Sequence, residues 1–282
     1  AMAYLEELAN RSDANLGARI ALVRARIGSG DTDAALALAT ELADANPDND
    51  DLRFIVATTQ VLAGDFDAAE GTFRDLLAVN PQRARVWLQL SQLAQRKGDR
   101  DTAKAVIDEA LVQMPVDASL LWAKASFLEQ DGDVEEAIAI YEGLYERNSG
   151  ALVIANNLAS LLSTYRDDAE SLERAWTIAR RFSETDFGPI QDTYGWILHR
   201  RGQSADALPY LESAAAALPD DPLAQYHLGE TYAALERPED ALAQFQRVVA
   251  LAGPSDTRPQ IEIARQQIQI LLDMPASEGA DE

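Results

Sequence analysis

The chain has 282 residues, of which 47% are hydrophobic and 25% charged, the balance of an ordinary folded protein. Its formal net charge of −23 argues against nucleic acid or an anionic membrane as a partner, because both are bound by basic side chains. The absence of cysteine excludes disulfides, thiol catalysis and cysteine-based zinc sites, and no apolar run approaches the roughly 20 residues of a membrane-spanning helix.

Short motifs recur along the chain at an interval of 34 residues. Gly-Asp pairs stand at residues 30–31, 64–65, 98–99 and 132–133, and alanines keep the same interval from Ala35 onwards. A fixed period of this length indicates stacked copies of one small unit.

The start of the chain is expected to come from an earlier unit. Leu5 and Leu8 fall one interval before Ala39 and Leu42, and the first three residues resemble an expression scar. We therefore expect residues 1–13 to hold the second helix of a preceding repeat, and the chain to be a fragment of a longer repeat protein.

Seven units of helix, turn and helix are predicted between residues 14 and 254. Glycine at the end of the first helix supplies a left-handed backbone, and the Asp, Thr or Ser that follows can cap the second helix. Proline then stops the second helix, because it has no backbone N–H to donate. The predicted repeats span 14–47, 48–81, 82–115, 116–149, 150–187, 188–221 and 222–254.

Small residues recur at one position of the first helix in repeats 2 to 7. Because small side chains let two helices approach closely, we expect the second helix of each repeat to pack there. These residues are Ala57, Ser91, Ala125, Ala159, Gly195 and Gly229.

Two segments depart from the period. Repeat 5 carries about four extra residues around Tyr165–Asp168, which replace the Gly-Asp turn and are expected to lengthen the first helix or the turn. After Pro254, an apolar stripe that includes Ile261 and Ala264 predicts a capping helix over 255–274, with Pro259 in its first turn. Residues 275–282 form an acidic tail that is expected to be disordered.

The pattern of Trp, Leu, Gly, Tyr, Ala, Phe and Pro at fixed offsets resembles the tetratricopeptide repeat over nearly the whole chain. The resemblance implies an all-α fold, a right-handed superhelical solenoid whose first helices line a concave groove. It also implies a scaffold that binds a protein segment in that groove.

Ten candidate partner-binding residues follow from the groove positions of this family. Asparagine can pair with the backbone of an extended peptide, and Trp and Tyr combine apolar area with a polar group. Alternatively, Trp122 and Trp196 pack between neighbouring repeats. The candidates are Trp122, Asn156, Asn157, Ser160, Asp192, Trp196, His199, Tyr226, His227 and Glu230.

We expect no enzymatic activity, metal or cofactor. His199, His227 and Glu230 could approach one another as a metal or acid–base group, but a Glu three residues after a His is common by chance. No phosphate-binding loop or catalytic serine motif occurs.

The expected partner is a protein or peptide of basic or apolar character. Chaperone-binding members of the family hold a carboxylate with Lys, Arg and Asn, whereas the groove here has few cations (Arg24, Arg85 and Arg200). The negative charge would favour a basic segment, although it also serves solubility. We expect a monomer or a weak homo-oligomer.

Residues 150–250 show a closer resemblance. Asn156–Leu162, Asp192–Trp196 and Tyr226–Gly229 resemble the last repeats of large bacterial tetratricopeptide proteins, including lipoproteins linked to exopolysaccharide production and surface-protein sorting. This implies a bacterial cell-envelope assembly, in the periplasm rather than the cytoplasm. The alternative is a self-associating structural protein.

Overall fold

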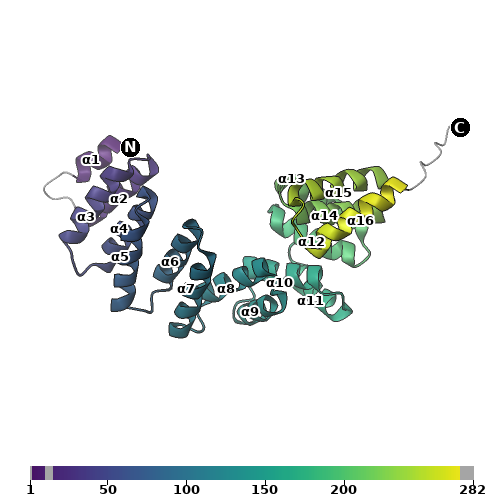
Figure 1. Cartoon of the computed structure of the whole chain (residues 1–282), viewed down its shortest axis with the longest axis horizontal. Coiled ribbons are helices and arrows are strands. Elements are labelled where there is room, and N and C mark those ends of the chain that lie inside the picture. Colours follow the sequence, from purple (N-terminus) through teal and green to yellow (C-terminus); the bar gives the residue numbers. More distant parts are fainter. Residues whose placement is uncertain (1, 10–14, 274–282) are drawn as a thin grey trace. The chain divides into compact units, whose positions relative to one another are not determined.

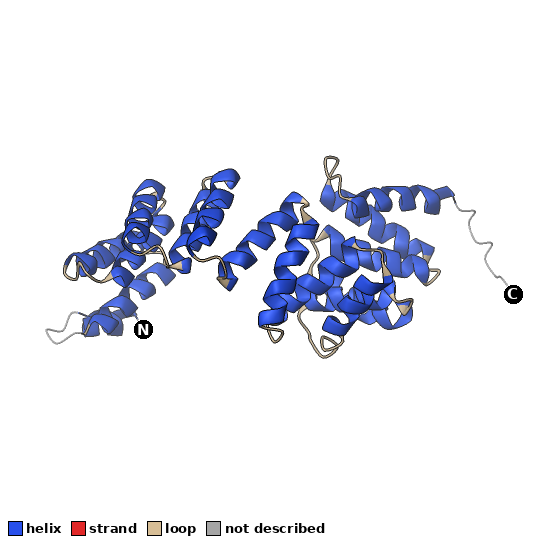
Figure 2. Cartoon of the chain, turned by 90° about the horizontal axis from the view of Figure 1, so that it is seen from below, coloured by secondary structure: helices blue, strands red, loops and turns tan. Residues whose placement is uncertain are grey.

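The protein folds into helices throughout the part that the structure describes. The computed structural model describes residues 2–9 and 15–273, and within these ranges the chain forms sixteen α-helices and no strand (Figure 1, Figure 2). The all-α prediction is therefore confirmed. The predicted acidic tail at 275–282 and the end of the predicted N-terminal remnant, at 10–13, lie outside the described residues.

The helices follow one another in pairs, and each predicted repeat interval holds one pair. The first helix of each pair carries an even number and the second helix an odd number. The helices are α1 Met2–Ala9, α2 Leu16–Gly28, α3 Thr32–Asp44, α4 Asp50–Ala63, α5 Phe66–Val79, α6 Ala84–Arg96, α7 Arg100–Gln113, α8 Ala118–Asp131, α9 Val134–Arg147, α10 Leu152–Tyr165, α11 Ala169–Ala179, α12 Gly188–Arg200, α13 Ser204–Ala217, α14 Pro222–Ala234, α15 Pro238–Ala252 and α16 Pro259–Asp273.

The chain divides into two compact units, residues 1–133 and residues 134–282. In the N-terminal unit α4 contacts α6 and α6 contacts α8, and in the C-terminal unit α10 contacts α12 and α12 contacts α14. The first helices of neighbouring repeats therefore form a continuous side within each unit, which we call its first-helix face.

Six of the seven first helices end in the same tight turn. The residue that ends the turn has a positive φ, near +80° in Gly64 and Gly132 and +57° in Glu236. The residue after it donates its backbone N–H to the carbonyl five residues earlier, as Asp65 does to Gln60 at 3.0 Å. This is the bond pattern of a glycine-ended helix, as the Gly-Asp period predicts.

The first helix of repeat 5 ends differently. Helix α10 has 14 residues, as α4 and α8 do, so the extra residues do not lengthen it. Arg166 follows with an extended backbone, and the side chain of Asp168 accepts the backbone N–H of Ser171 at 2.8 Å to start α11. Helix α11 has only 11 residues. The extra length thus lies in the turn at 166–168 and in the connection at 180–187.

The predicted close-packing positions are confirmed at two glycines. A Cβ atom on Gly195 would lie 2.7 Å from Cγ of Leu211, and one on Gly229 would lie 2.8 Å from Cε1 of Phe245. Each glycine lets the second helix of its repeat lie directly against the first.

Helix α16 begins at Pro259, the residue predicted for its first turn, and packs against α14 and α15. It buries Ile261 and Ala264, while Leu272 stays exposed. The helix thus covers the apolar side of the last repeat.

Candidate functional site

The predicted partner-binding residues all lie on first helices. Trp122 is on α8 in the N-terminal unit, and the other nine are in the C-terminal unit on α10, α12 and α14. The first-helix face of each unit is therefore considered separately.

Trp122 borders a hollow in the N-terminal unit between α6 and α8. The indole is 42% exposed, and the cavity has a volume of about 230 Å³. All of its lining side chains are uncharged, and glutamines make up much of its polar part. We call it the amide hollow, and it is lined by Leu88, Ser91, Gln92, Gln95, Ile107, Trp122, Ala123, Ser126, Phe127 and Gln130.

The amide hollow offers the groups that hold an extended chain. An amide side chain donates and accepts, so it can pair with a peptide N–H or C=O. Gln92 already accepts from Gln89 at 2.9 Å, and Gln130 accepts from Arg100 at 2.6 Å, which orients both amides. Trp122 adds a large apolar surface beside them.

Trp196 is buried in the C-terminal unit and stacks on two histidine rings. Its ring centroid lies 4.2 Å from that of His227 and 5.0 Å from that of His199, and both pairs are nearly parallel. Its indole N–H donates to the backbone carbonyl of Ser163 at 3.1 Å. Trp196 therefore ties α10, α12 and α14 together, which agrees with packing between neighbouring repeats.

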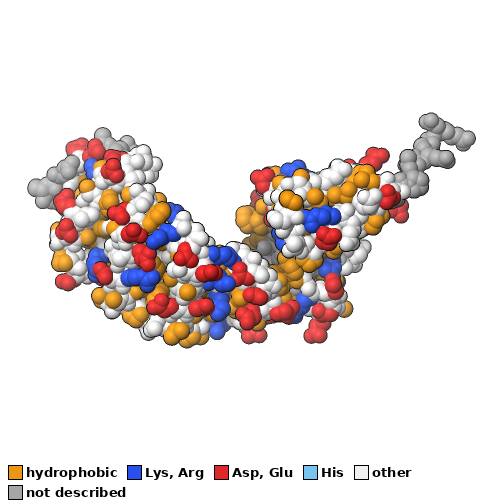
Figure 3. Space-filling view, in the orientation of Figure 1, with side chains coloured by type: hydrophobic (Ala, Val, Ile, Leu, Met, Phe, Trp, Pro, Cys, Tyr) orange, Lys and Arg blue, Asp and Glu red, His pale blue; other side chains and the backbone are white. Residues whose placement is uncertain are grey.

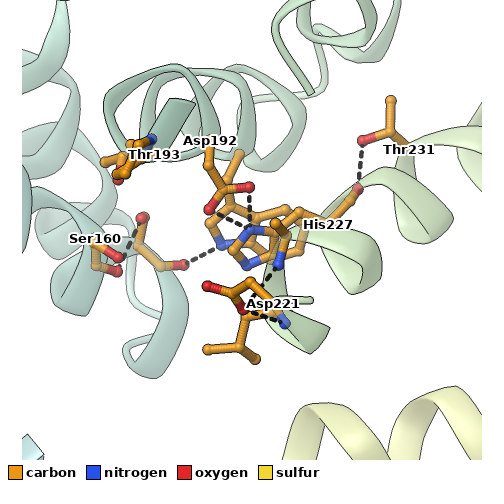
Figure 4. A network of polar contacts seen from close by, with 11 residues as sticks. Ser160, Asp192, Thr193, Asp221, His227 and Thr231 are labelled. Atoms are coloured by element: carbon orange, nitrogen blue, oxygen red, sulfur yellow. Dashed lines mark hydrogen bonds and ion pairs between the residues drawn. The ribbon is translucent and has the colours of Figure 1, made fainter. Parts of the chain in front are cut away.

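His227 is paired with Asp192 on the neighbouring first helix. Its Nδ1 atom lies 3.0 Å from each carboxylate oxygen of Asp192, and Figure 4 shows that carboxylate directed at the ring. Because a carboxylate can only accept, Nδ1 carries the hydrogen. In the neutral ring Nε2 is then an acceptor, and this buried atom has no hydrogen-bond partner among the described residues.

His199 also stacks on Trp196, one helical turn later on α12. Its Nδ1 atom is 3.2 Å from the hydroxyl oxygens of Ser204 and Thr231. Burial, with smaller contributions from the nearby His227 and Arg200, lowers the pKa of His199 to about 4. His199 is therefore neutral at neutral pH.

Glu230 lies one helical turn after His227 and is half-buried. Its Oε1 atom is buried and has no hydrogen-bond partner in the described part of the chain. Burial raises the pKa of Glu230, and His227 partly opposes this. Burial also raises the pKa of Tyr226, and Glu230 adds to that effect.

The asparagine pair on α10 is divided between two environments. Asn157 donates to the hydroxyl of Tyr141 at 3.0 Å, which ties it to α9. The Oδ1 atom of Asn156 is buried and meets no donor from residues 2–9 or 15–273. Ser160 is half-buried on the same helix.

Four of the ten predicted residues do not offer an open surface. Asn156, Trp196, Tyr226 and His227 are at most 9% exposed, because neighbouring first helices cover them. The expectation that they line an open groove needs correction to this extent. A partner-binding role for the ten residues stays a prediction.

The sequence reading missed Gln95 and Gln130 of the amide hollow. The signal was present in the spacing, since Gln95 follows Gln92 by three residues and Gln130 follows Ser126 by four. It also missed the carbonyl of Ser163, because a backbone acceptor leaves no trace in the sequence.

Within the described ranges, no three His, Asp or Glu side chains are grouped so as to hold a metal ion. No helix in those ranges has the length and apolar character needed to cross a bilayer.

Two solved structures share this fold. The crystal structure of the APC/C hetero-tetramer Cut9–Hcn1 matches 96% of the chain with a TM-score of 0.58 and 14% identity, and the chain spans 52% of that protein. A tetratricopeptide repeat protein from Parabacteroides merdae matches 95% of the chain and 99% of its own length, with a TM-score of 0.52 and 13% identity. At such identities the likeness concerns the fold alone. No curated protein matches the chain significantly.

Two family models, both described as tetratricopeptide repeat, match the sequence. One matches residues 26–87, and the other matches residues 88–151 and 195–256, so that together they cover about two thirds of the chain. Stacked repeats of this kind commonly serve as scaffolds for protein interactions and are typically non-catalytic. The chain belongs to the tetratricopeptide repeat family.

Proposed function

We propose that this protein is a non-enzymatic scaffold that binds an extended segment of a protein partner on its first-helix face, with the amide hollow as a main contact. The observation that carries this proposal is Trp122, a large apolar side chain left 42% exposed beside an uncharged, glutamine-lined cavity. Exposed aromatic residues beside polar groups are favoured at binding hot spots.

The chemistry of the amide hollow supports an apolar or polar segment rather than an acidic one. None of its lining side chains is charged, and the guanidinium of Arg100, which donates to Gln130, is already paired with Asp131, so it is not free to hold a carboxylate. The net charge of −23 also disfavours an acidic partner.

We also propose a place in a bacterial cell-envelope assembly, supported by the resemblance of residues 150–250 to large bacterial envelope repeat proteins. Fractionation of the source cells, with antibodies against the native protein, tests this location. Recovery in the cytoplasm alone would contradict it.

The binding proposal is tested with Trp122→Ala. The chain and the variant are used to capture partners from the envelope and soluble fractions of the source cell, and the affinity for the captured protein is then measured. We expect the affinity to fall about tenfold or more, because truncating a central aromatic residue removes much of the binding free energy.

Val112→Ala is the matched control. Val112 is 77% exposed on α7, a second helix of the same unit, so its truncation removes exposed apolar area away from the amide hollow. We expect it to leave capture unchanged. If the Trp122 variant captures the same protein with unchanged affinity, the amide hollow is not the binding site.

A further inference from the structure

The first-helix face of the C-terminal unit carries buried acceptors that no donor satisfies. They are Nε2 of His227 and Oε1 of Glu230 on α14, and Oδ1 of Asn156 on α10. His227 is only 2% exposed, and its Nδ1 hydrogen is already given to Asp192, so that Nε2 is an acceptor when the ring is neutral. A buried acceptor without a donor is unfavourable, so such a group selects for a ligand that donates.

The acidic groups near these acceptors are also only partly paired with cations. Arg200 is the cation that acts on Tyr226, and its guanidinium donates to the carbonyl of Ser163 at 2.7 Å and to Asp167 at 3.1 Å. Arg200 is therefore committed to α10 and the turn after it. Among the described residues, Glu230 forms no ion pair within 4 Å, although its carboxyl group is largely removed from water.

Buried carboxylates in folded proteins are normally paired with a cation. Asp192 and Glu230 bring two partly buried carboxylates to this neighbourhood, whereas Asp167 is exposed and already paired with Arg200. The local field thus favours a second positive group. The Oε1 atom of Glu230 is buried but the side chain as a whole is partly exposed, so such a group can approach the carboxylate from its exposed side.

We propose that Glu230 and Nε2 of His227 form a receptor for the guanidinium group of an arginine side chain on the partner. This deepens and rests on the proposed function, because the arginine belongs to the bound protein segment. A guanidinium presents several N–H donors in one plane, so it can donate to both acceptors at once. The ring of Tyr226 lies beside that of His227, with centroids 5.9 Å apart, and adds an aromatic surface next to these acceptors.

The test is a titration of the full chain with two probes, followed by nuclear magnetic resonance. The probes are N-acetyl-arginine methylamide and its neutral isostere, N-acetyl-citrulline methylamide. The reporters are the indole N–H of Trp196, assigned with Trp196→Phe, and the carboxyl carbon of Glu230. We expect saturable shifts of both reporters with the arginine probe only, together with a lower pKa of Glu230 when the probe is bound.

Two variants with the same change of charge complete the test. Glu230→Gln keeps the shape of the side chain and should weaken binding of the arginine probe at least tenfold. Glu184→Gln removes an exposed carboxylate from the connection at 180–187 and should leave binding unchanged. A melting curve of each variant verifies that it is folded.

Equal shifts with the citrulline probe, or binding that survives Glu230→Gln, would overturn the proposal. Equal binding of N-acetyl-lysine methylamide would overturn the assignment to a guanidinium. These results can be distinguished from those of the test at Trp122. If the arginine probe causes no shift while partner capture through the amide hollow is intact, this inference is wrong and the proposed function is unaffected.

Discussion

His199, which stacks on Trp196, shows how a polar side chain can be held neutral inside a repeat array. His199 stacks on the indole and meets two hydroxyl groups, whereas His227 faces a carboxylate. A hydroxyl can donate to a neutral imidazole, but it cannot compensate a buried positive charge as a carboxylate does. Burial therefore dominates at His199 and lowers its pKa to about 4.

The lowered pKa of His199 predicts a loss of stability in mild acid. Below pH 6.5 the unfolded chain takes up a proton at this residue, while the folded chain does so only near pH 4. The free energy of unfolding should therefore fall as the pH drops through this window. Urea denaturation from about pH 7 to about pH 5 measures the slope, which should be smaller in His199→Gln.

Two other sets of groups must be separated from His199. Glu230 acts in the opposite direction, because its raised folded pKa adds stability as the pH falls, and Glu230→Gln removes that contribution. Carboxyl groups with a lowered pKa, such as that of Asp256, lose their contribution only as the pH falls below about 4. Identical slopes for the native chain and His199→Gln above pH 5 would contradict the prediction.

At the scale of helices, the packing of α14 against α15 depends on the missing side chain of Gly229. A methyl group there would lie 2.8 Å from the ring of Phe245, so Gly229→Ala forces the ring or the helix to move. Overpacking of this kind destabilises by about 1–3 kcal/mol, which exceeds the gain of roughly 1 kcal/mol from a better helix former.

Gly143 in α9 provides the matched comparison. A Cβ atom there meets nothing within 4 Å, so Gly143→Ala should raise the free energy of unfolding by about 0.5–1 kcal/mol. Denaturant unfolding of both variants measures the two effects. A stabilising effect at Gly229 would show that the helix spacing adjusts freely, and a destabilising effect at Gly143 would contradict the expected gain in helix propensity.

Much of the helix packing and many of the turns could be predicted from the sequence, because the residues that determine them are close together in the chain. A glycine that ends α4 and small residues at Gly195 and Gly229 each act within one repeat, and the 34-residue period reveals them. The turn of repeat 5 could be predicted less well. The sequence shows extra residues there, but the cap that Asp168 places on Ser171 decides which segment absorbs them.

The candidate site was predicted less fully, for a physical reason. The period places Trp196 on the first-helix face. Whether its ring is exposed to solvent depends on His199, which follows it by 3 residues, and on His227, which follows it by 31 residues. Such burial is a property of three helices together. Trp122 stands three residues before Ala125, the small residue of its first helix, whereas Trp196 directly follows Gly195, and no comparable ring stack forms on Trp122 within the described residues.

At the scale of the whole molecule, the excess of 47 acidic over 24 basic residues dominates the electrostatics. Figure 3 shows both kinds of charge spread over the visible face of each unit. Many of the basic side chains form ion pairs, as Arg19 does with Glu41 at 2.6 Å. Such exposed pairs each contribute only about 0–1 kcal/mol, so the unpaired acidic groups leave a net self-repulsion.

We therefore expect sodium chloride to stabilise the fold while it weakens the binding of a basic ligand. Raising the salt from about 20 mM to about 0.5 M shortens the screening length from about 20 Å to about 4 Å. The urea midpoint should rise, and the affinity for the arginine probe should fall over the same range. Glycerol, which carries no charge, serves as the control, and a lower urea midpoint in salt would contradict the prediction.

The shared turn at the ends of six first helices has a consequence for how such a chain can change in evolution. Each turn needs only one residue with a positive φ and one backbone bond to the carbonyl five residues earlier, so a unit of 34 residues carries its own stop signal. Duplication or loss of one unit leaves every other helix end intact, and the length of the array can therefore vary in whole steps. Repeat 5, whose first helix is followed by Arg166 and whose second helix is capped by Asp168, is the unit whose length departs from these whole steps.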